Sequence, residues 1–352
     1  MRTEFLRDIE LSGEASMVAA TPYDALIGAA KSLVDTQMLA ACDTPPASAV
    51  RAYISANSAH LAAARAALAA VCRVPLRYDS SFFGEHCEAL SPLRNLAQSF
   101  ALEFQQAAAD GDYSAAARIG VDLLDLANAI RRGGLVIDLL VSIAVGSIAI
   151  NLLRGVRRHL GASDRQALIR QLTRTEHDQE PVPLIIARDR HWESAVGYQE
   201  EKVDLTRQPL LDPAECGLTE DQQRELLERM QSFSTMPHDA RRSIYTNQDR
   251  YTIALLRMLA VDLTLRSWRA EKGAYPDGLG PLAATFVEGV PDDPFTQKPF
   301  CYRRLLDGFV LYSPGPTNID HGGAFGPWPM VQAGAADLCL DSGDYGLGSH
   351  RN

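Results

Sequence analysis

The fold is decided by the stretch SPLRNLAQSFALEFQQAAADGDYSAAARIGVDLLDLANAIRRGGLVIDLLVSIAVGSIAINLL, residues 91–153. Its apolar side chains recur every three or four positions, as they do on the inner faces of packed helices. Ser91 and Pro92 form a start signal, because Ser is a good N-cap and Pro is favoured at the first helical position. Gly111 stops the first helix and Asp112 caps the next. The stretch therefore predicts a helical hairpin followed by a third helix.

That third helix, residues 134–153, is long and apolar enough to cross a bilayer. It carries Asp138 and Asn151, however, and a charged side chain is costly inside a membrane. We therefore expect a fully buried core helix. Arginines flank the segment, and we interpret them as solvated helix ends rather than membrane anchors: Arg131, Arg132, Arg154, Arg157 and Arg158.

Outside this stretch the chain alternates between helical and polar segments. Further helices are expected over residues 24–39, 47–71 and 163–172, and from Thr219 to a break at Met236 and Pro237. Ser163 and Gln166 form a capping box for the third of these helices. Residues 175–189 are polar and contain two prolines, so they are expected to form a loop.

The C-terminal part has a different sequence pattern, with one long helical segment followed by short alternating runs. Residues 239–272 predict one long helix that ends at Gly273. Two alternating runs follow, at residues 300–304 and 309–312, with Asp307-Gly308 between them. Asp-Gly between alternating runs is a strong hairpin signal. The fold class is therefore α+β, with an all-α N-terminal domain followed by a long helix and a small antiparallel sheet.

These patterns divide the chain of 352 residues into five parts. The expected parts are an N-terminal tail (1–22), a helical domain (23–175), a connector with short helices (176–238), a C-terminal head (239–330) and an acidic, Gly-rich tail (331–352). A small sheet on one helix has few other sources of burial, so we expect aromatic side chains to hold the head together, namely Tyr275, Phe295, Phe300, Tyr302, Phe309 and Tyr312.

Four short motifs in the C-terminal part occur in a fixed order. They are AEKGAYP (270–276), VPDDPF (290–295), FVLYSPG (309–315) and DHGG (320–323). Together they resemble the globular head of the type II secretion major pseudopilin, over residues 245–323. The resemblance covers about a quarter of the chain. It implies a long helix, a Tyr-Pro loop and a hairpin in this part.

The chain also departs from the pseudopilin plan. A pseudopilin begins with a cleavable leader and an apolar helix, whereas residues 1–20 here contain no apolar run. We therefore do not expect it to polymerise as a pilin does. The N-terminal half resembles planctomycete-type proteins that carry the same head, in which a membrane-spanning helix usually precedes an opening like residues 11–15. Membrane association is expected only if such a helix precedes Met1.

The resemblance also implies a calcium site, because such heads often bind calcium through their C-terminal loop. The matching loop, residues 313–323, offers Asn318 and Asp320 as oxygen ligands. His321 is a poor ligand for calcium, and Asp337, Asp341 or Asp344 could contribute only if the tail folds back. The alternative is a plain turn held by side-chain hydrogen bonds.

Composition excludes several classes of protein. The net charge is -10, which argues against a nucleic-acid binder but not against a small basic patch. The six cysteines form no close pairs, so a zinc site is not expected. Cys72 and Cys87 are expected to be free thiols, with a disulfide as the alternative. No nucleophile, phosphate-loop or dinucleotide motif is present.

The sequence therefore favours a non-enzymatic scaffold protein of the cell envelope, in which a helical interaction domain carries a pseudopilin-like head and binds protein partners. One alternative is a hydrolase or other enzyme with its site in the helical domain. The other is a peptide-binding helical module of tetratricopeptide type, which requires a concave groove.

Overall fold

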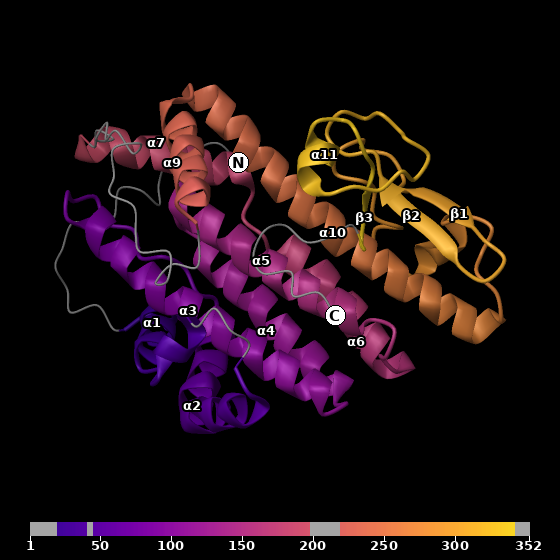
Figure 1. The fold of residues 1–352 in the computed structure, drawn as a ribbon, viewed down its shortest axis with the longest axis horizontal. Helices are drawn as coiled ribbons and strands as arrows, with labels where there is room; N and C mark the ends of the chain where they lie inside the picture. Colours follow the sequence, from indigo (N-terminus) through magenta and orange to yellow (C-terminus); the bar gives the residue numbers. More distant parts are fainter. Residues whose placement is uncertain (1–19, 41–44, 198–218, 342–352) are drawn as a thin grey trace.

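A computed structural model describes residues 20–40, 45–197 and 219–341. It is mostly helical, with a three-stranded antiparallel sheet near the C-terminus, and this confirms the α+β class (Figure 1). The helical elements are α1 (Pro22–Lys31), η1 (Thr36–Ala40), α2 (Ala47–Leu68), α3 (Phe82–Ala109), α4 (Tyr113–Arg131), α5 (Val136–Val156), α6 (Ala162–His177), α7 (Val182–Val196), α9 (Glu220–Thr235), α10 (His238–Lys272), η3 (Gly280–Thr285) and α11 (Trp328–Gln332). The strands are β1 (Cys301–Arg304), β2 (Phe309–Ser313) and β3 (Leu338–Cys339).

The turn between α3 and α4 forms as its residues predict. Gly111 adopts a positive φ of 80°, which costs glycine little. The Asp112 side chain then accepts a hydrogen bond from the Ala115 amide at 2.8 Å and caps α4. The predicted end at Gly273 is also confirmed, since this glycine has a positive φ after α10, and Gly133 has a positive φ after α4 in the same way.

The predicted helix start at Ser91 and Pro92 is wrong. Helix α3 begins at Phe82 and runs through Pro92 to Ala109. Its first part is fixed by contacts from elsewhere in the chain, because His86 is buried and hydrogen-bonded to Asp138 of α5. Tertiary packing therefore outweighs the local preference of proline for a helix start.

Two further boundaries also differ from expectation. The segment 24–39 is not one helix, because the Asn57 side chain hydrogen-bonds both the amide and the carbonyl of Val34 and holds the chain between α1 and η1. Residues 175–189 are not a loop, because Pro181 and Pro183 lie at the start of α7, where a missing N–H costs little. Helix α6 starts after Gly161 with no side-chain cap from Ser163.

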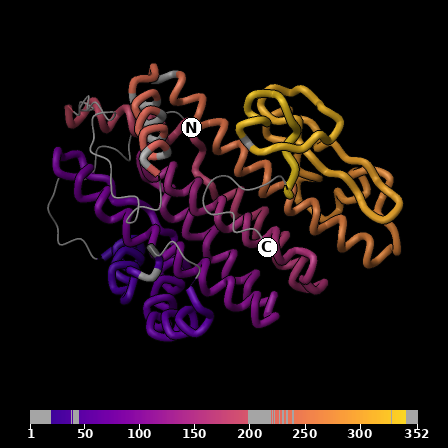
Figure 2. Tube along the Cα trace, in the orientation of Figure 1, coloured from indigo at the N-terminus to yellow at the C-terminus, as the bar shows by residue number. Residues whose placement is uncertain are grey.

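Helix α5 lies in the middle of the helical layer and packs against α3, α4, α7 and α10 (Figure 2). Ten of the 21 residues of α5 are buried, whereas Ala144, Asn151 and Gly155 are exposed, so the expectation of a fully buried helix is wrong for about half of its length. In the described part of the chain it is the one helix long and apolar enough to cross a membrane, and half of its apolar window is buried against protein.

Helix α10 runs parallel to α5 and joins the C-terminal part to the helical domain. At one end Arg131 pairs with Asp249 at 2.5 Å, and at the other Arg157 pairs with Asp262 at 3.3 Å. One hydrophobic core extends from Leu26 in α1, through α10, to Leu340 beyond the sheet. The break at Met236 and Pro237 therefore separates α9 from α10, but it does not separate two hydrophobic cores.

The sheet has the order β1-β2-β3, and β2 is its central strand. The predicted hairpin forms, with Arg304 opposite Phe309 and the Leu305 amide bonded to the Gly308 carbonyl at 2.9 Å. Strand β3 pairs Cys339 with Tyr312. Residues 331–341 therefore belong to the head and not to a tail, which corrects the predicted boundary at residue 330. Residues 1–19 and 342–352 of the two predicted tails lie outside the described residues.

Candidate functional site: an arginine-lined cleft

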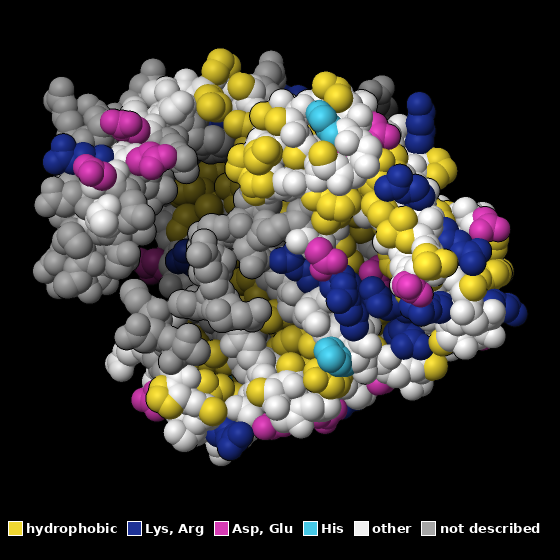
Figure 3. Space-filling view, turned by 45° about the vertical axis from the view of Figure 1, so that its right-hand side comes forward, with side chains coloured by type: hydrophobic (Ala, Val, Ile, Leu, Met, Phe, Trp, Pro, Cys, Tyr) yellow, Lys and Arg dark blue, Asp and Glu magenta, His cyan; other side chains and the backbone are white. Residues whose placement is uncertain are grey.

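A cleft of about 1100 Å³ lies between the C-terminal ends of α5 and α10 and the β1–β2 hairpin. One wall is apolar and includes Tyr275, Phe309, Leu311, Phe325 and Leu340. The charged lining consists of Arg157, Arg158, Arg266, Arg269, Asp262, Asp307 and Asp341. Figure 3 shows the Lys and Arg side chains gathered on this face, beside the head. The cleft therefore combines apolar side chains with a charged lining in which arginines outnumber carboxylates by four to three.

The arginines gather here because the C-terminal end of α5 packs beside the last third of α10, where Arg157 meets Asp262. Arg154 lies in the last turn of α5 and Arg269 in the last turn of α10. Cations at a helix C-terminus interact favourably with its macrodipole. The expectation of solvated helix ends is wrong for Arg131 and Arg157, whose side chains are buried and paired with Asp249 and Asp262.

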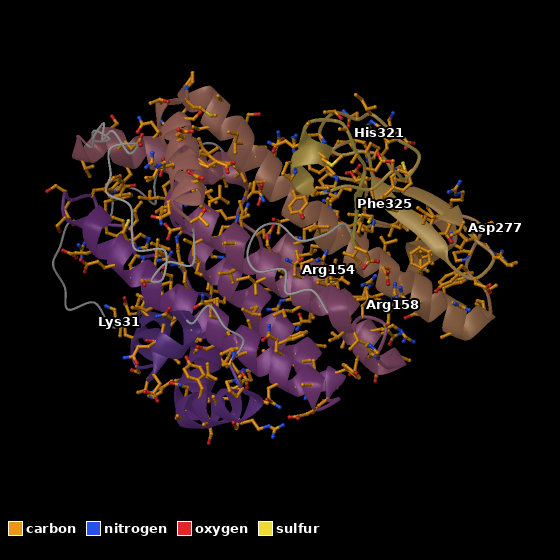
Figure 4. All side chains as sticks on the ribbon, viewed as in Figure 1. Lys31, Arg154, Arg158, Asp277, His321 and Phe325 are labelled. Atoms are coloured by element: carbon orange, nitrogen blue, oxygen red, sulfur yellow. The ribbon has the colours of Figure 1, made fainter. Side chains whose placement is uncertain are left out.

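Arg157 fastens the end of the head to the helical domain. Its Nη2 donates to both carboxylate oxygens of Asp341, at 2.8 and 2.6 Å. The neighbouring Arg154 donates to the Leu340 carbonyl at 2.8 Å. Figure 4 shows Arg154 and Arg158 near the C-terminal end of α5. The buried arginine of the cleft thus already holds two carboxylates, those of Asp262 and Asp341.

Two other arginines keep their hydrogen-bonding capacity. The Arg158 side chain is 65% exposed and lies 4.0 Å from Asp341, too far for a hydrogen bond. Arg269 is exposed, stacks over the Tyr275 ring at 5.0 Å and forms no ion pair within the described residues. Both guanidinium groups can therefore donate to an anionic ligand.

The loop predicted to bind calcium is held by its own carboxylates. Asp320 accepts hydrogen bonds from the Tyr312 hydroxyl at 2.9 Å and the Gly322 amide at 2.7 Å. These bonds, the amide first, hold the pKa of Asp320 below its ordinary value. Asn318 lies in the same loop with a positive φ of 58°. The carboxylate of Asp320 thus has partners within the protein, and the calcium site at Asn318 and Asp320 stays a prediction.

Asp337 does fold back onto this loop. It is fully buried and accepts hydrogen bonds from the amides of His321 and Gly323. Figure 4 places His321 on the outer part of the head, away from Arg154 and Arg158. Within the described ranges no three His, Cys, Asp or Glu side chains are grouped to hold a metal ion.

The helical domain contains one buried pair of titratable groups. His86 Nε2 lies 2.6 Å from Asp138 Oδ1, and Asp138 Oδ2 accepts the Leu135 amide at 2.7 Å. Neither side chain lines any of the larger pockets of the described residues. The pair therefore caps α5 and joins it to α3.

The cysteines fit the expectation of free thiols where they are described. Cys72, Cys87 and Cys301 are free, whereas Cys42 and Cys216 lie outside the described residues. Burial raises the pKa of each of the first three thiols. A raised pKa lowers the thiolate fraction and hence the reactivity of these groups.

Sequence reasoning found the arginines around α5 but did not bring them together with those of α10. Arg157 and Asp262 are 105 positions apart, and no local pattern joins them. The three-residue spacing of Arg266 and Arg269 at the end of a long helix was the available signal.

Comparison with known proteins gave no match to a family model, to a curated protein or to a solved structure. The relation to pseudopilin heads therefore rests on the four motifs alone.

Proposed function

We propose that this protein is a non-enzymatic scaffold that holds an anionic segment of a partner protein in its arginine-lined cleft. The observation that carries the proposal is the convergence of exposed arginines from α5 and α10 on one cleft, in a chain whose net charge is -10. A local cationic site on an acidic protein attracts anionic groups selectively, because the rest of the surface repels them.

The position of the cleft supports a scaffold. Its walls come from both the helical domain and the pseudopilin-like head, which share one core and so present a fixed surface. The apolar residues Phe309 and Phe325 line the same cleft as the arginines. An interface with an apolar centre and charged neighbours is typical of protein–protein recognition. The motifs that resemble pseudopilins support a location at the cell envelope.

The test is fluorescence anisotropy with a labelled, short oligoglutamate peptide and the full chain. We expect saturable binding that weakens as salt is added, because exposed charges are screened. The variant carrying Arg158→Ser and Arg269→Ser is expected to lose about ten-fold or more in affinity, since each lost charged hydrogen bond is worth roughly 1.5–3 kcal/mol.

A matched control is Arg94→Ser, because Arg94 is an exposed arginine of α3 that lines neither arginine pocket. It should leave the affinity unchanged. Equal loss of affinity in the double variant and the control would show that the peptide responds only to net charge, and the proposed cleft function would be wrong.

A further inference from the structure

A second, smaller pocket adjoins the cleft and is lined by arginines from three elements. Its volume is about 330 Å³. Its lining consists of Arg158, Arg165, Arg266, Arg269, Ala270, Gly273 and Tyr275. The lining thus includes four guanidinium groups and no carboxylate. Four cations around one small space repel one another unless an anion lies between them.

Two of the four arginines are held in place by the protein. Arg165 donates to the Leu160 carbonyl at 2.5 Å and to the Ser267 hydroxyl at 3.2 Å. Arg266 is paired with Asp262 one helical turn earlier. A site whose donors are already fixed loses little entropy when a ligand binds. These two arginines therefore form a prearranged base for the pocket.

The other two arginines are available to the ligand. Arg158 is exposed just beyond the end of α5, and the guanidinium carbon of Arg269 lies over the Tyr275 ring at 5.0 Å from its centroid. An arginine that stacks on an aromatic ring keeps the edge of its guanidinium free to donate. The guanidinium groups of Arg158 and Arg269 together offer more N–H donors than a single carboxylate can accept in a bidentate pair. A tetrahedral oxyanion, with its oxygens in different directions, can accept from both.

We propose that this pocket binds the phosphate group of a phosphorylated side chain in the partner segment. The proposal rests on the proposed function and names the ligand chemistry of the same site. A phosphate monoester carries about -1.5 to -2 charge near neutral pH, which matches the combined charge of the two exposed guanidinium groups, those of Arg158 and Arg269. The apolar wall of the adjoining cleft, with Phe309, Phe325 and Leu340, would contact the neighbouring residues of the segment.

The observations favour a protein segment over other carriers of phosphate. Nucleic acids and anionic membranes are bound by cations spread along a surface, and a net charge of -10 opposes both. Here four arginines converge on one small, open pocket that adjoins a cleft with apolar lining residues. One phosphorylated side chain with apolar neighbours fits that arrangement.

The experiment measures anisotropy of the full chain with three labelled peptides of one apolar sequence, which carry phosphotyrosine, tyrosine or glutamate at the central position. We expect the phosphopeptide to bind about ten-fold or more tightly than either of the others. The double variant Arg158→Lys with Arg269→Lys keeps the charge but removes the planar guanidinium groups. It should lose most of the preference for the phosphotyrosine peptide. Arg94→Lys is the control and should retain it.

Further measurements distinguish a phosphorylated peptide from inorganic phosphate and from a lipid headgroup. Inorganic phosphate at millimolar concentration should compete with the phosphopeptide. Equal binding of the phosphotyrosine and glutamate peptides, still dependent on Arg158 and Arg269, would overturn the phosphate assignment but leave the proposed function intact. Binding to none of these peptides and none to oligoglutamate would overturn both. Arginine-dependent binding to phosphatidylserine vesicles without phosphopeptide binding would assign the pocket to a membrane surface instead.

Discussion

Asp138 is the single carboxylate on which the helical domain depends most. It is fully buried, and its two oxygens accept hydrogen bonds from the Leu135 amide and from His86. A buried polar group is tolerated only when it is hydrogen-bonded, and removing one partner leaves the other unsatisfied. The apolar helix α5 therefore needs Asp138 to cap its N-terminus, although Asp138 is a charged residue within an apolar segment of the sequence.

Replacing this side chain tests its role. Asp138→Ala is expected to lower the free energy of unfolding by about 2–4 kcal/mol, because the Leu135 amide and His86 lose their partner inside the core. Urea unfolding followed by circular dichroism measures the change. The control is Asp277→Ala, whose side chain is 93% exposed (Figure 4) and which should change stability by less than about 0.5 kcal/mol. Equal losses of unfolding free energy in the two variants would contradict the role of Asp138 in the buried core.

Asp189 makes the stability depend on pH. Its Oδ1 accepts the Val136 amide at 2.9 Å, but burial outweighs this bond and raises the pKa of the carboxyl to about 6. The folded state thus keeps a proton that the unfolded state releases near pH 3.8. Its contribution to stability is present at low pH and is lost as pH rises through about 6.

Asp189→Asn keeps the acceptor oxygen and removes the titration. The variant and the wild type should have equal stability below about pH 4, and the variant should be the more stable of the two above about pH 6. Guanidinium unfolding of both proteins across this range measures the difference. A difference that does not change with pH would show that Asp189 titrates at its ordinary value in the folded protein.

At the level of single elements, the glycine and aspartate signals predicted helix boundaries well, whereas the proline signals were misleading. Gly111 and Gly273 end helices with positive φ, a preference that belongs to glycine itself. Pro92 and Pro183 gave misleading signals, since the length of α3 and the start of α7 depend on buried partners such as His86 and Trp192. The cleft could not be predicted because Arg157, Asp262 and Asp341 meet only after α5, α10 and β3 are packed together.

Strand β2 offers a test of the predicted hairpin and its register. Leu311 is buried at 7% exposure, whereas Leu306 in the turn is 97% exposed. Leu311→Ala should cost about 2–4 kcal/mol and Leu306→Ala less than about 0.5 kcal/mol. Thermal unfolding of the two variants measures both. The reverse order would mean that the strand is shifted by one residue, which would turn Leu311 outward.

At the scale of the whole molecule, the head and the helical domain share one core through α10. The buried pair of Arg131 and Asp249, and the contact of Arg157 with Asp341, join segments from both parts. We therefore expect one cooperative unfolding transition in calorimetry, with equal calorimetric and van't Hoff enthalpies. Two resolved transitions would show that the parts unfold independently despite the shared core.

The arrangement that gives the molecule one core also creates its cleft, because the ends of α5 and α10 bring arginines together beside the sheet. Crystals soaked in selenate, a tetrahedral oxyanion, would show by anomalous scattering where such an anion binds. We predict the strongest selenium peak between Arg158, Arg165 and Arg269, within hydrogen-bond distance of their guanidinium groups. A cleft without such a peak, with selenate bound elsewhere on the surface, would contradict the proposed binding function.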